Sequence, residues 1–314
     1  MDTAPTAGTI DSVMEEPLRY DIDRMATPWF EGPFLEPLLA KANLPTDQAQ
    51  LVRDFARDGY LIVDDLGLDD FDAIADSIVR DLAPRYTGPI RRVTDAWRFH
   101  DGVRRLATAP KIAELLRLLY RRDPIPFQTL NFDVGTEQKL HSDLIHFDSI
   151  PRRYMAGVWV ALEDIDESNG ALMYVPGSHR FPEYHYTDIG LPPEESAYPH
   201  YARFVELLCE HQGHEPVVQP MRRGQALIWS ANLLHGGSPI GRPGSTRHSQ
   251  VTHFYFDDCT WYIPRLSQFP GRLCFREVCD IRTGQLATPM AGGGPVDLDL
   301  QEWVWRVTRP DDEP

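Results

Sequence analysis

The spacing of apolar side chains changes character once along the chain, near residue 125. Between residues 46 and 120 the apolar positions recur every three or four residues, which predicts helices over 46–58, 70–82 and 111–120. Thr46 is the expected N-cap of the first helix, and Gly59 is expected to end it. The apolar run that follows, 60–63, predicts a strand. This part of the chain is therefore mostly helical.

From Ile125 onwards apolar and polar positions tend to alternate, which predicts a strand-rich region. Turn-forming Gly, Pro, Asn and Asp residues separate the apolar stretches. The predicted strands cover 126–133, 140–145, 155–165, 171–175, 217–221, 225–230 and 249–256. Helices followed by many antiparallel strands predict an α+β fold, with a double-stranded β-helix (jelly-roll, cupin-like) core and N-terminal flanking helices.

The same pattern suggests how the chain is divided. Residues 1–45 contain several prolines and little periodicity, and we expect a partly irregular arm lying on the body. Residues 46–314 show no clean internal boundary and are interpreted as a single catalytic jelly-roll domain with a C-terminal extension. The long segment 180–200 is expected to be a lid or binding loop. A predicted hairpin, 273–287, is a candidate for a homodimer contact or for part of the pocket wall.

Composition narrows the possible partners. The chain has 314 residues with 31 Lys and Arg against 47 Asp and Glu, a formal net charge of −16. Such a surface repels phosphate backbones and anionic lipid, so we expect no nucleic acid and no membrane partner, although a local basic pocket for an anionic small molecule remains compatible with it. The four cysteines form no C-x-x-C pair, and the N-terminus has no secretory pattern. We therefore expect reduced thiols and a cytoplasmic protein.

Two histidines and one aspartate are the strongest chemical signal. His141 and Asp143 are two residues apart in a predicted strand, where such side chains point the same way. His235, from a distant segment, would complete the two-histidine, one-carboxylate arrangement that is diagnostic of non-heme Fe(II) oxygenases. A second pair, His146 and Asp148, is a rival; we favour His141 and Asp143 for their leading position and their spacing to Trp159.

Several short motifs in this region resemble one known family in both order and spacing. They are His141-Ser142-Asp143, Trp159 in GVWVALED, Asn169-Gly170, Pro176-Gly177-Ser178-His179, His235-Gly236 and Arg247. Over about residues 50–257 the chain resembles the phytanoyl-CoA dioxygenase (PhyH) family of Fe(II)/2-oxoglutarate-dependent oxygenases. The resemblance implies that His141, Asp143 and His235 are the iron ligands.

It also implies a set of cosubstrate contacts. Arg247 would bind the distal carboxylate of 2-oxoglutarate, since a planar guanidinium makes a bidentate pair that lysine cannot copy. Trp159 and Gln128 match positions that line the cosubstrate or substrate pocket, and Ser249 could donate a further hydrogen bond. Relatives often carry a basic residue where this chain has Asp133, so no contact is carried over for that position.

The function implied by the resemblance is oxidation of a small-molecule substrate. Fe(II), 2-oxoglutarate and O2 would together oxidise a C–H bond, with release of succinate and CO2. Related halogenases replace the ligating carboxylate with a small residue, so the intact Asp143 favours hydroxylation or another oxidation. Two alternatives stay open: a cupin-type metal-dependent isomerase or hydrolase that does not use 2-oxoglutarate, and a catalytically inactive binding barrel. Arg247 separates them, because the cosubstrate assignment fails if it does not face the metal pocket. No residue identifies the substrate.

Overall fold

The structure, a computed structural model, describes residues 25–88, 91–268 and 271–306. Its helices are α2 Leu35–Ala42, α3 Thr46–Asp58, α4 Phe71–Leu82, α5 Asp101–Ala107, α6 Pro110–Tyr120 and α7 Tyr198–Gln212. Its longer strands are β1 Tyr60–Val63, β3 Pro124–Phe132, β5 Met155–Ala161, β8 Ala226–Ser230 and β10 Ser249–Phe256. The short strands are β2 Arg92–Thr94, β4 Asp148–Ile150, β6 Leu172–Tyr174, β7 Val217–Gln219, β9 His235–Gly237, β11 Thr260–Tyr262, β12 Phe275–Arg276, β13 Cys279–Asp280, β14 Gln285–Leu286, β15 Met290–Ala291, β16 Gly294–Pro295 and β17 Val304–Trp305.

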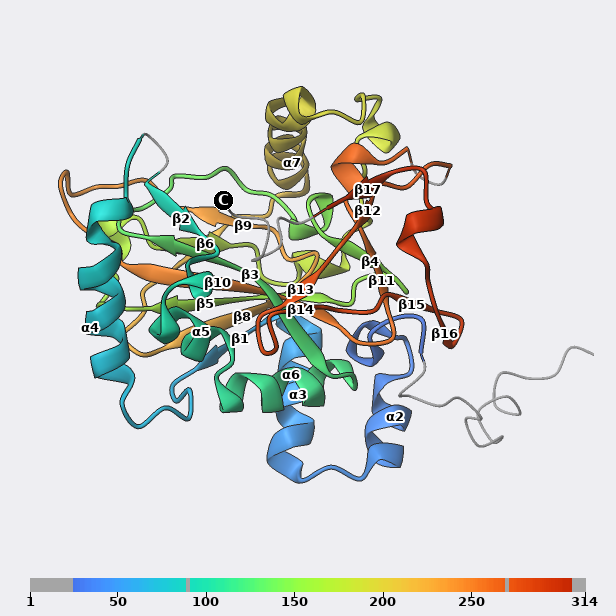
Figure 1. Ribbon diagram of the computed structural model, residues 1–314, viewed down its shortest axis with the longest axis horizontal. Helices are drawn as coiled ribbons and strands as arrows, with labels where there is room; N and C mark the ends of the chain where they lie inside the picture. The colour runs from blue at the N-terminus through green and yellow to red at the C-terminus, as the bar shows by residue number, and fades with distance from the viewer. Residues whose placement is uncertain (1–24, 89–90, 269–270, 307–314) are drawn as a thin grey trace, which may run out of the picture.

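Two facing sheets form the centre of the molecule (Figure 1). The major sheet has the antiparallel order β1-β8-β5-β10-β3-β2, and the minor sheet has the order β7-β6-β9. A β-bridge between His141 and His235 adds the segment around residue 141 to the free side of β9. From β3 onwards the chain passes repeatedly between the two sheets, with β6 and β7 as consecutive strands of the minor sheet, and this is the connectivity of a jelly roll. The predicted fold is confirmed.

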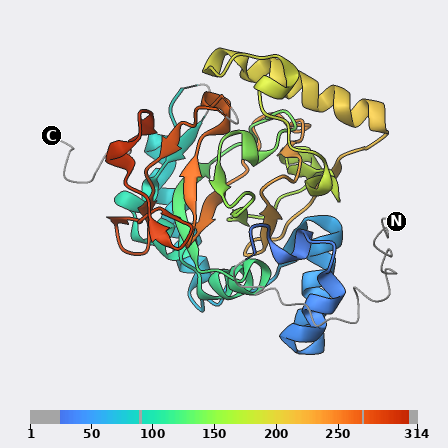
Figure 2. The ribbon, with the colours of Figure 1, turned by 90° about the vertical axis from the view of Figure 1, so that its right-hand side faces the viewer.

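Apolar side chains fill three layers, and these layers explain why the strands of the major sheet are buried on both faces. The space between the sheets holds residues such as Trp159, Leu227 and Trp229. On the outer face of the major sheet, residues such as Val158 and Ile228 pack against α3, α4, α5 and α6. Helix α7 lies on the other side of the molecule and packs on residues that flank the minor sheet (Figure 2). The site between the sheets is therefore held in a rigid frame.

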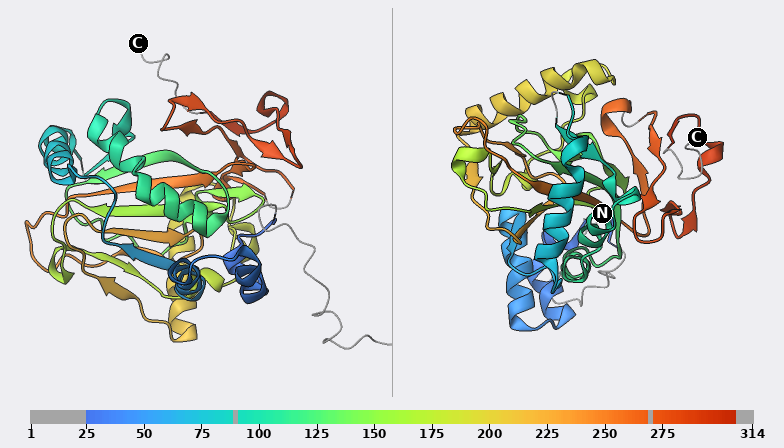
Figure 3. Two further views of the ribbon diagram at one scale, coloured as in Figure 1. Left: turned by 90° about the horizontal axis from the view of Figure 1, so that it is seen from below. Right: turned by 60° about the vertical axis from the view of Figure 1, so that its left-hand side comes forward.

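Three C-terminal strands and β4 build a further, four-stranded sheet beside the jelly roll. Its order is β17-β12-β11-β4, with β12 and β17 parallel and the other neighbours antiparallel. Figure 3 shows these orange and red strands as a layer of their own against the jelly roll. Because β4 follows the His141–Asp143 segment directly, this sheet is anchored next to the predicted metal ligands.

Most predicted elements are present, and some match closely. The strand predicted over 249–256 is β10, and the helices predicted over 46–58, 70–82 and 111–120 are α3, α4 and α6. Gly59 ends α3 with a φ of 80°, as expected for a left-handed C-cap. Thr46, however, is the first residue of the helix and makes no capping bond, so its prediction as the N-cap is wrong.

Other predictions need correction. Segment 140–145 is not a strand: it makes one bridge at His141 and then a short 3-10 turn, Asp143–Ile145. Part of the predicted arm forms α2, whose Leu38 and Leu39 are buried, while residues 1–24 lie outside the described residues. The C-terminal hairpin forms only as β13 and β14, because β12 pairs with β11 and β17 instead. None of the helices in the described ranges has both the length and the apolar character needed to span a bilayer.

Candidate metal centre and its pocket

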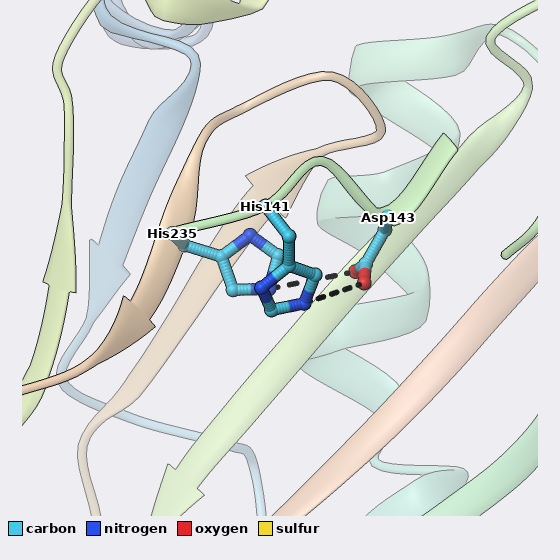
Figure 4. Close-up of side chains that lie close together, drawn as sticks. All are labelled: His141, Asp143 and His235. Carbon is cyan, nitrogen blue, oxygen red and sulfur yellow. Dashed lines mark ion pairs between the residues drawn. The ribbon is translucent and has the colours of Figure 1, made fainter. Parts of the chain in front are cut away.

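His141, Asp143 and His235 converge between the two sheets (Figure 4). His141 Nε2 lies 3.7 Å from Asp143 Oδ1, and His235 Nε2 lies 3.7 Å from Asp143 Oδ2. All three residues are buried. Two atoms that bind one transition-metal ion at about 2.1 Å can lie no more than about 4.2 Å apart, so these distances suit ligands of a shared ion.

Main-chain contacts bring the two histidines together. The backbone N–H groups of His141 and His235 each donate to the other residue's carbonyl oxygen, at 3.0 Å in both cases. Gly236 permits this approach, because a Cβ at that position would lie 2.5 Å from the carbonyl oxygen of Gln138. The turn after His141, capped by the Ser142 hydroxyl, then directs Asp143 towards both imidazoles. The convergence expected from the sequence occurs, but through a turn instead of a regular strand.

Backbone carbonyls fix which nitrogen of each imidazole faces the centre. His141 Nδ1 lies 2.9 Å from the carbonyl oxygen of Lys139, and His235 Nδ1 lies 2.9 Å from that of Leu233. Since a carbonyl can only accept, both Nδ1 atoms carry the proton and both Nε2 atoms present a lone pair. Burial, helped by the nearby His235, lowers the pKa of His141 to about 4, which keeps that imidazole neutral as a metal ligand requires.

Asp143 is held by an indole and surrounded by three imidazoles. Trp229 Nε1 donates to Asp143 Oδ2 at 2.8 Å, and a third histidine, His253 on β10, has its Nε2 3.7 Å from the same oxygen. Burial alone would raise the pKa of Asp143, but the histidines and the indole N–H bring it down to about 2. Gly157 makes room for the indole, since a Cβ there would lie 2.1 Å from the ring of Trp229. Two imidazole nitrogens and a carboxylate oxygen thus form the donor set, which fits Fe(II).

The group extends into a cavity of about 360 Å³ that reaches Arg247. Arg247 is buried, and one of its terminal N–H groups donates to the carbonyl oxygen of Gly170 at 3.0 Å. Its Nε has no hydrogen-bond partner, and no carboxylate of the described residues pairs with it. The guanidinium lies 5.6 Å from the ring centres of both Phe132 and Trp159. Burial lowers its pKa only to about 10, so it stays charged at neutral pH and lacks an anion.

The remaining predicted contacts differ in their placement. Gln128 lines the cavity, and its amide oxygen lies 3.2 Å from His253 Nδ1. Ser249 is buried, but its hydroxyl donates to the carbonyl oxygen of Arg247 at 3.4 Å and it is not among the residues that line the cavity. The Asp133 carboxylate pairs with Arg91, so the acidic residue at this position is used in a local ion pair.

The side chains of the rival pair, His146 and Asp148, lie in different places in the structure. His146 lines the cavity and accepts a hydrogen bond on Nδ1 from Arg265 at 3.0 Å. Asp148 is buried elsewhere: the hydroxyl of Tyr262 donates to its Oδ2 at 2.7 Å, and Arg152 pairs with the same oxygen at 3.2 Å. These two side chains therefore do not combine into one centre, whereas those of His141 and Asp143 do.

Asp148 also belongs to a second cluster of possible metal ligands, with Glu183 and His185. Arg152 pairs with both carboxylates of this cluster, and Arg153 pairs with Glu183 as well. Guanidinium groups thus already neutralise these carboxylates, and the cluster ties the 181–185 segment to the turn after β4. We interpret it as an ion-pair network and not as a metal site.

Several pocket residues were not foreseen from the sequence. His253 could have been found, because it lies on the predicted strand 249–256 at the same parity as Arg247, and alternate residues share one face. Trp229, in strand β8, gave no signal beyond apolar character. The cavity is also lined by Arg92, Arg265 and Arg276, which come from an edge strand and from the C-terminal extension.

Comparison with known proteins identifies the family of this chain. The family model described as phytanoyl-CoA dioxygenase (PhyH) matches residues 55–248. An ectoine dioxygenase of Sphingopyxis alaskensis is 28% identical over 218 residues, covering 59% of this chain and 68% of the relative. Mouse peroxisomal phytanoyl-CoA dioxygenase is 28% identical over 160 residues, and the match covers 48% of this chain and only 42% of that protein.

A solved structure shares the fold. The carbocyclase SnoK from nogalamycin biosynthesis, described as non-heme and α-ketoglutarate dependent, has a TM-score of 0.57 at 16% identity, and the match covers 70% of this chain and 87% of SnoK. At this identity the likeness concerns the fold alone. The family model, in contrast, covers more than half of the chain. The protein therefore belongs to the phytanoyl-CoA dioxygenase family of Fe(II)/2-oxoglutarate-dependent oxygenases.

Proposed function

We propose that the protein hydroxylates an unactivated C–H bond of a small-molecule metabolite, with His141, Asp143 and His235 holding the iron. The observation that carries this proposal is the position of Arg247. It is a buried, charged guanidinium without a carboxylate partner among the described residues, and it lines the same cavity as the three metal-binding side chains. A dicarboxylate that reaches from the iron to Arg247 would supply the missing anion.

Bound iron and 2-oxoglutarate supply the oxidising chemistry, in which O2 is consumed, the cosubstrate becomes succinate and CO2, and a C–H bond of the substrate is oxidised. The protein's own residues bind and orient the reactants. Arg247 would grip the distal carboxylate between Phe132 and Trp159, and Gln128 and His253 would offer polar contacts elsewhere in the cavity. Aromatic walls exclude water from the space where the reaction occurs.

Two alternatives are less well supported. A cupin-type isomerase or hydrolase without 2-oxoglutarate leaves the charge of Arg247 unmatched, and an inactive barrel leaves the complete ligand set without a purpose. Asp143 also occupies the place that a halogenase would need to leave open, so we favour hydroxylation. The cytoplasmic location and the dimer contact expected from the sequence stay predictions.

Anaerobic titration with Fe(II) and 2-oxoglutarate tests the proposal directly. The wild-type protein should develop the visible charge-transfer band of the iron–cosubstrate chelate, and Asp143→Ala should lose both this band and substrate-coupled succinate formation. His146→Gln is the control, because His146 lines the cavity without completing the ligand group. Absence of the band in wild-type protein would refute the proposal. Loss of the band in His146→Gln together with its retention in Asp143→Ala would support the rival pair.

A further inference from the structure

The cavity has a charge opposite to that of the whole molecule. Four guanidinium groups line it, those of Arg92, Arg247, Arg265 and Arg276, together with a single carboxylate, Asp143. The chain as a whole carries a formal net charge of −16. The positive lining is therefore local and does not follow from composition. A pocket of this kind concentrates anions.

Two of the four arginines already have an anionic partner or an assigned one. Arg265 pairs with Glu195, which lies shortly before α7. Arg247 is assigned to the distal carboxylate of 2-oxoglutarate, and Asp143 is assigned to the iron. Arg92 and Arg276 are left with no carboxylate within ion-pair distance among the described residues. Bound iron and 2-oxoglutarate would thus leave the positive charges of Arg92 and Arg276 in the pocket without an anionic partner.

The surroundings of Arg276 are those of a prepared anion site. Its guanidinium lies 5.1 Å from the ring centre of Phe127 and 5.0 Å from that of Phe147, and its buried Nε has no hydrogen-bond partner. Neither nearby carboxyl forms an ion pair with it. Glu277 pairs with Arg306 at 2.6 Å, and Asp95, whose charge reaches Arg276, instead accepts a hydrogen bond from the backbone N–H of Thr129 at 3.0 Å. A buried N–H group without an acceptor is costly, and a bound oxyanion would remove this cost.

Arg276 lies on the side of the metal centre where His253 lies. The two rings beside Arg276, those of Phe127 and Phe147, have their centres 6.1 Å and 4.9 Å from the ring centre of His253. The contacts of Arg247, in contrast, are with Gly170, Phe132 and Trp159. The ring contacts of Arg276, Phe127 and Phe147, are different residues, which separates Arg276 from the cosubstrate's arginine, whereas Arg92 is the register partner of Phe132.

Much of this region lies outside the part of the chain that the family shares. The family model ends at residue 248, whereas Ile263, Arg265, Arg276 and Trp305 belong to the C-terminal sheet and its connections. Strand β12 places Arg276 beside Trp305 of β17, its register partner. These four residues, called the outer wall of the cavity below, thus follow the part of the chain that the family model matches, and they belong to the C-terminal layer in Figure 3.

We propose that the substrate carries an oxyanion group, a carboxylate or a phosphate, that Arg276 and Arg92 bind beside His253, with its apolar part against Phe147, Ile263 and Trp305. This inference rests on the proposed oxygenase function, because it assigns Arg247 to the cosubstrate. It specifies the substrate class as a small acid with an apolar body. Arg276, partly buried between aromatic rings, supplies the main contact, and Arg92, exposed at the rim, supplies the second.

Matched acids and amides provide the test. Anaerobic protein loaded with Fe(II) and 2-oxoglutarate is titrated with propionate, phenylacetate, their amides and phenyl phosphate, and binding is followed by tryptophan fluorescence and by the shift of the charge-transfer band. At least one acid should bind about tenfold or more tightly than its amide, since a charged hydrogen-bonded pair is replaced by a neutral contact. The comparison of phenylacetate with phenyl phosphate distinguishes the two oxyanions.

Substitutions show which arginine causes the preference for acids over amides. Arg276→Gln should abolish the preference for acids, and Arg92→Gln should weaken it, while the affinity for 2-oxoglutarate stays unchanged in both. Arg272→Gln is the matched control, because it removes one positive charge from the same extension at an exposed arginine that does not line the cavity. The retained charge-transfer band shows that each variant is folded.

Acids that bind no better than amides, or that do not bind at all, would overturn the inference. So would a preference for acids that persists when Arg92 and Arg276 are both replaced. If the charge-transfer band never forms in wild-type protein, the oxygenase proposal fails, but tryptophan fluorescence still reports whether acids bind through Arg276.

Discussion

The metal end of the pocket and its outer wall are built in different ways. At the metal end, His141, Asp143 and His235 come from the jelly roll, and buried groups hold each of them. The outer wall comes largely from the C-terminal sheet, and its Trp305 is 47% exposed. The metal end lies within the residues that the family model matches, whereas the outer wall does not. If our two proposals hold, the oxidising chemistry and the choice of substrate belong to separate parts of the chain.

Apart from the three metal ligands, Arg247 is the residue whose replacement should have the largest effect on the metal end of the pocket. Arg247→Gln should weaken 2-oxoglutarate binding about 100-fold, because it removes a buried charged pair, while Fe(II) binding is kept. The measurement is anaerobic titration of the charge-transfer band with 2-oxoglutarate. Arg242→Gln is the control, since Arg242 is exposed and lies outside the cavity. Equal affinity in Arg247→Gln and wild-type protein would show that the cosubstrate binds elsewhere.

Trp229 tests whether the metal end depends on the residues behind the ligands. Trp229→Phe removes the indole N–H that donates to Asp143 and leaves the ring position filled. We expect Fe(II) affinity to fall about tenfold, as for other hydrogen bonds to ligating carboxylates. Competition with a colorimetric chelator measures the change. An unchanged affinity would mean that the three ligands alone orient Asp143.

Trp305 tests the wall, with the smallest expected effect. Trp305→Ala should leave Fe(II) and 2-oxoglutarate binding unchanged and weaken the acid probes about fivefold, because the side chain is only partly buried. Tryptophan fluorescence changes with the substitution, so calorimetry is the suitable measurement. A loss of 2-oxoglutarate binding in this variant would mean that the wall and the metal end are not separate.

The sequence predicted the metal end far better than the wall, and the reason is the range of the interactions. Strand β10 follows from local alternation, and the pairing of His141 with His235 follows from motifs whose order and spacing the family shares. The turn at Asp143 escaped prediction because a single bridge ends the pairing there, and a period-two pattern does not reveal where pairing ends. Helix α7 was missed because the segment before it is rich in proline and tyrosine and shows no clear periodicity.

The role of Arg276 could not be predicted for a different reason. Its position depends on β12 pairing with β11 and β17 instead of forming a longer hairpin with β14. Two-residue strands have no periodicity of their own, so only the assembled sheet determines which side chains face the cavity. The excess of arginine over carboxylate groups in the cavity could not be predicted either, because the composition of the whole chain is acidic.

The bonds from His141 and His235 to main-chain carbonyls two residues upstream have a consequence for how this protein can change. Because those acceptors belong to the backbone, replacing the side chain of Lys139 or Leu233 should not change the orientation of either imidazole ring. Asp143, in contrast, accepts its hydrogen bond from a side chain, the indole of Trp229. Substitution at positions 139 and 233 should therefore preserve the orientation of the two rings, whereas substitution at Trp229 should change the electronic properties of the iron.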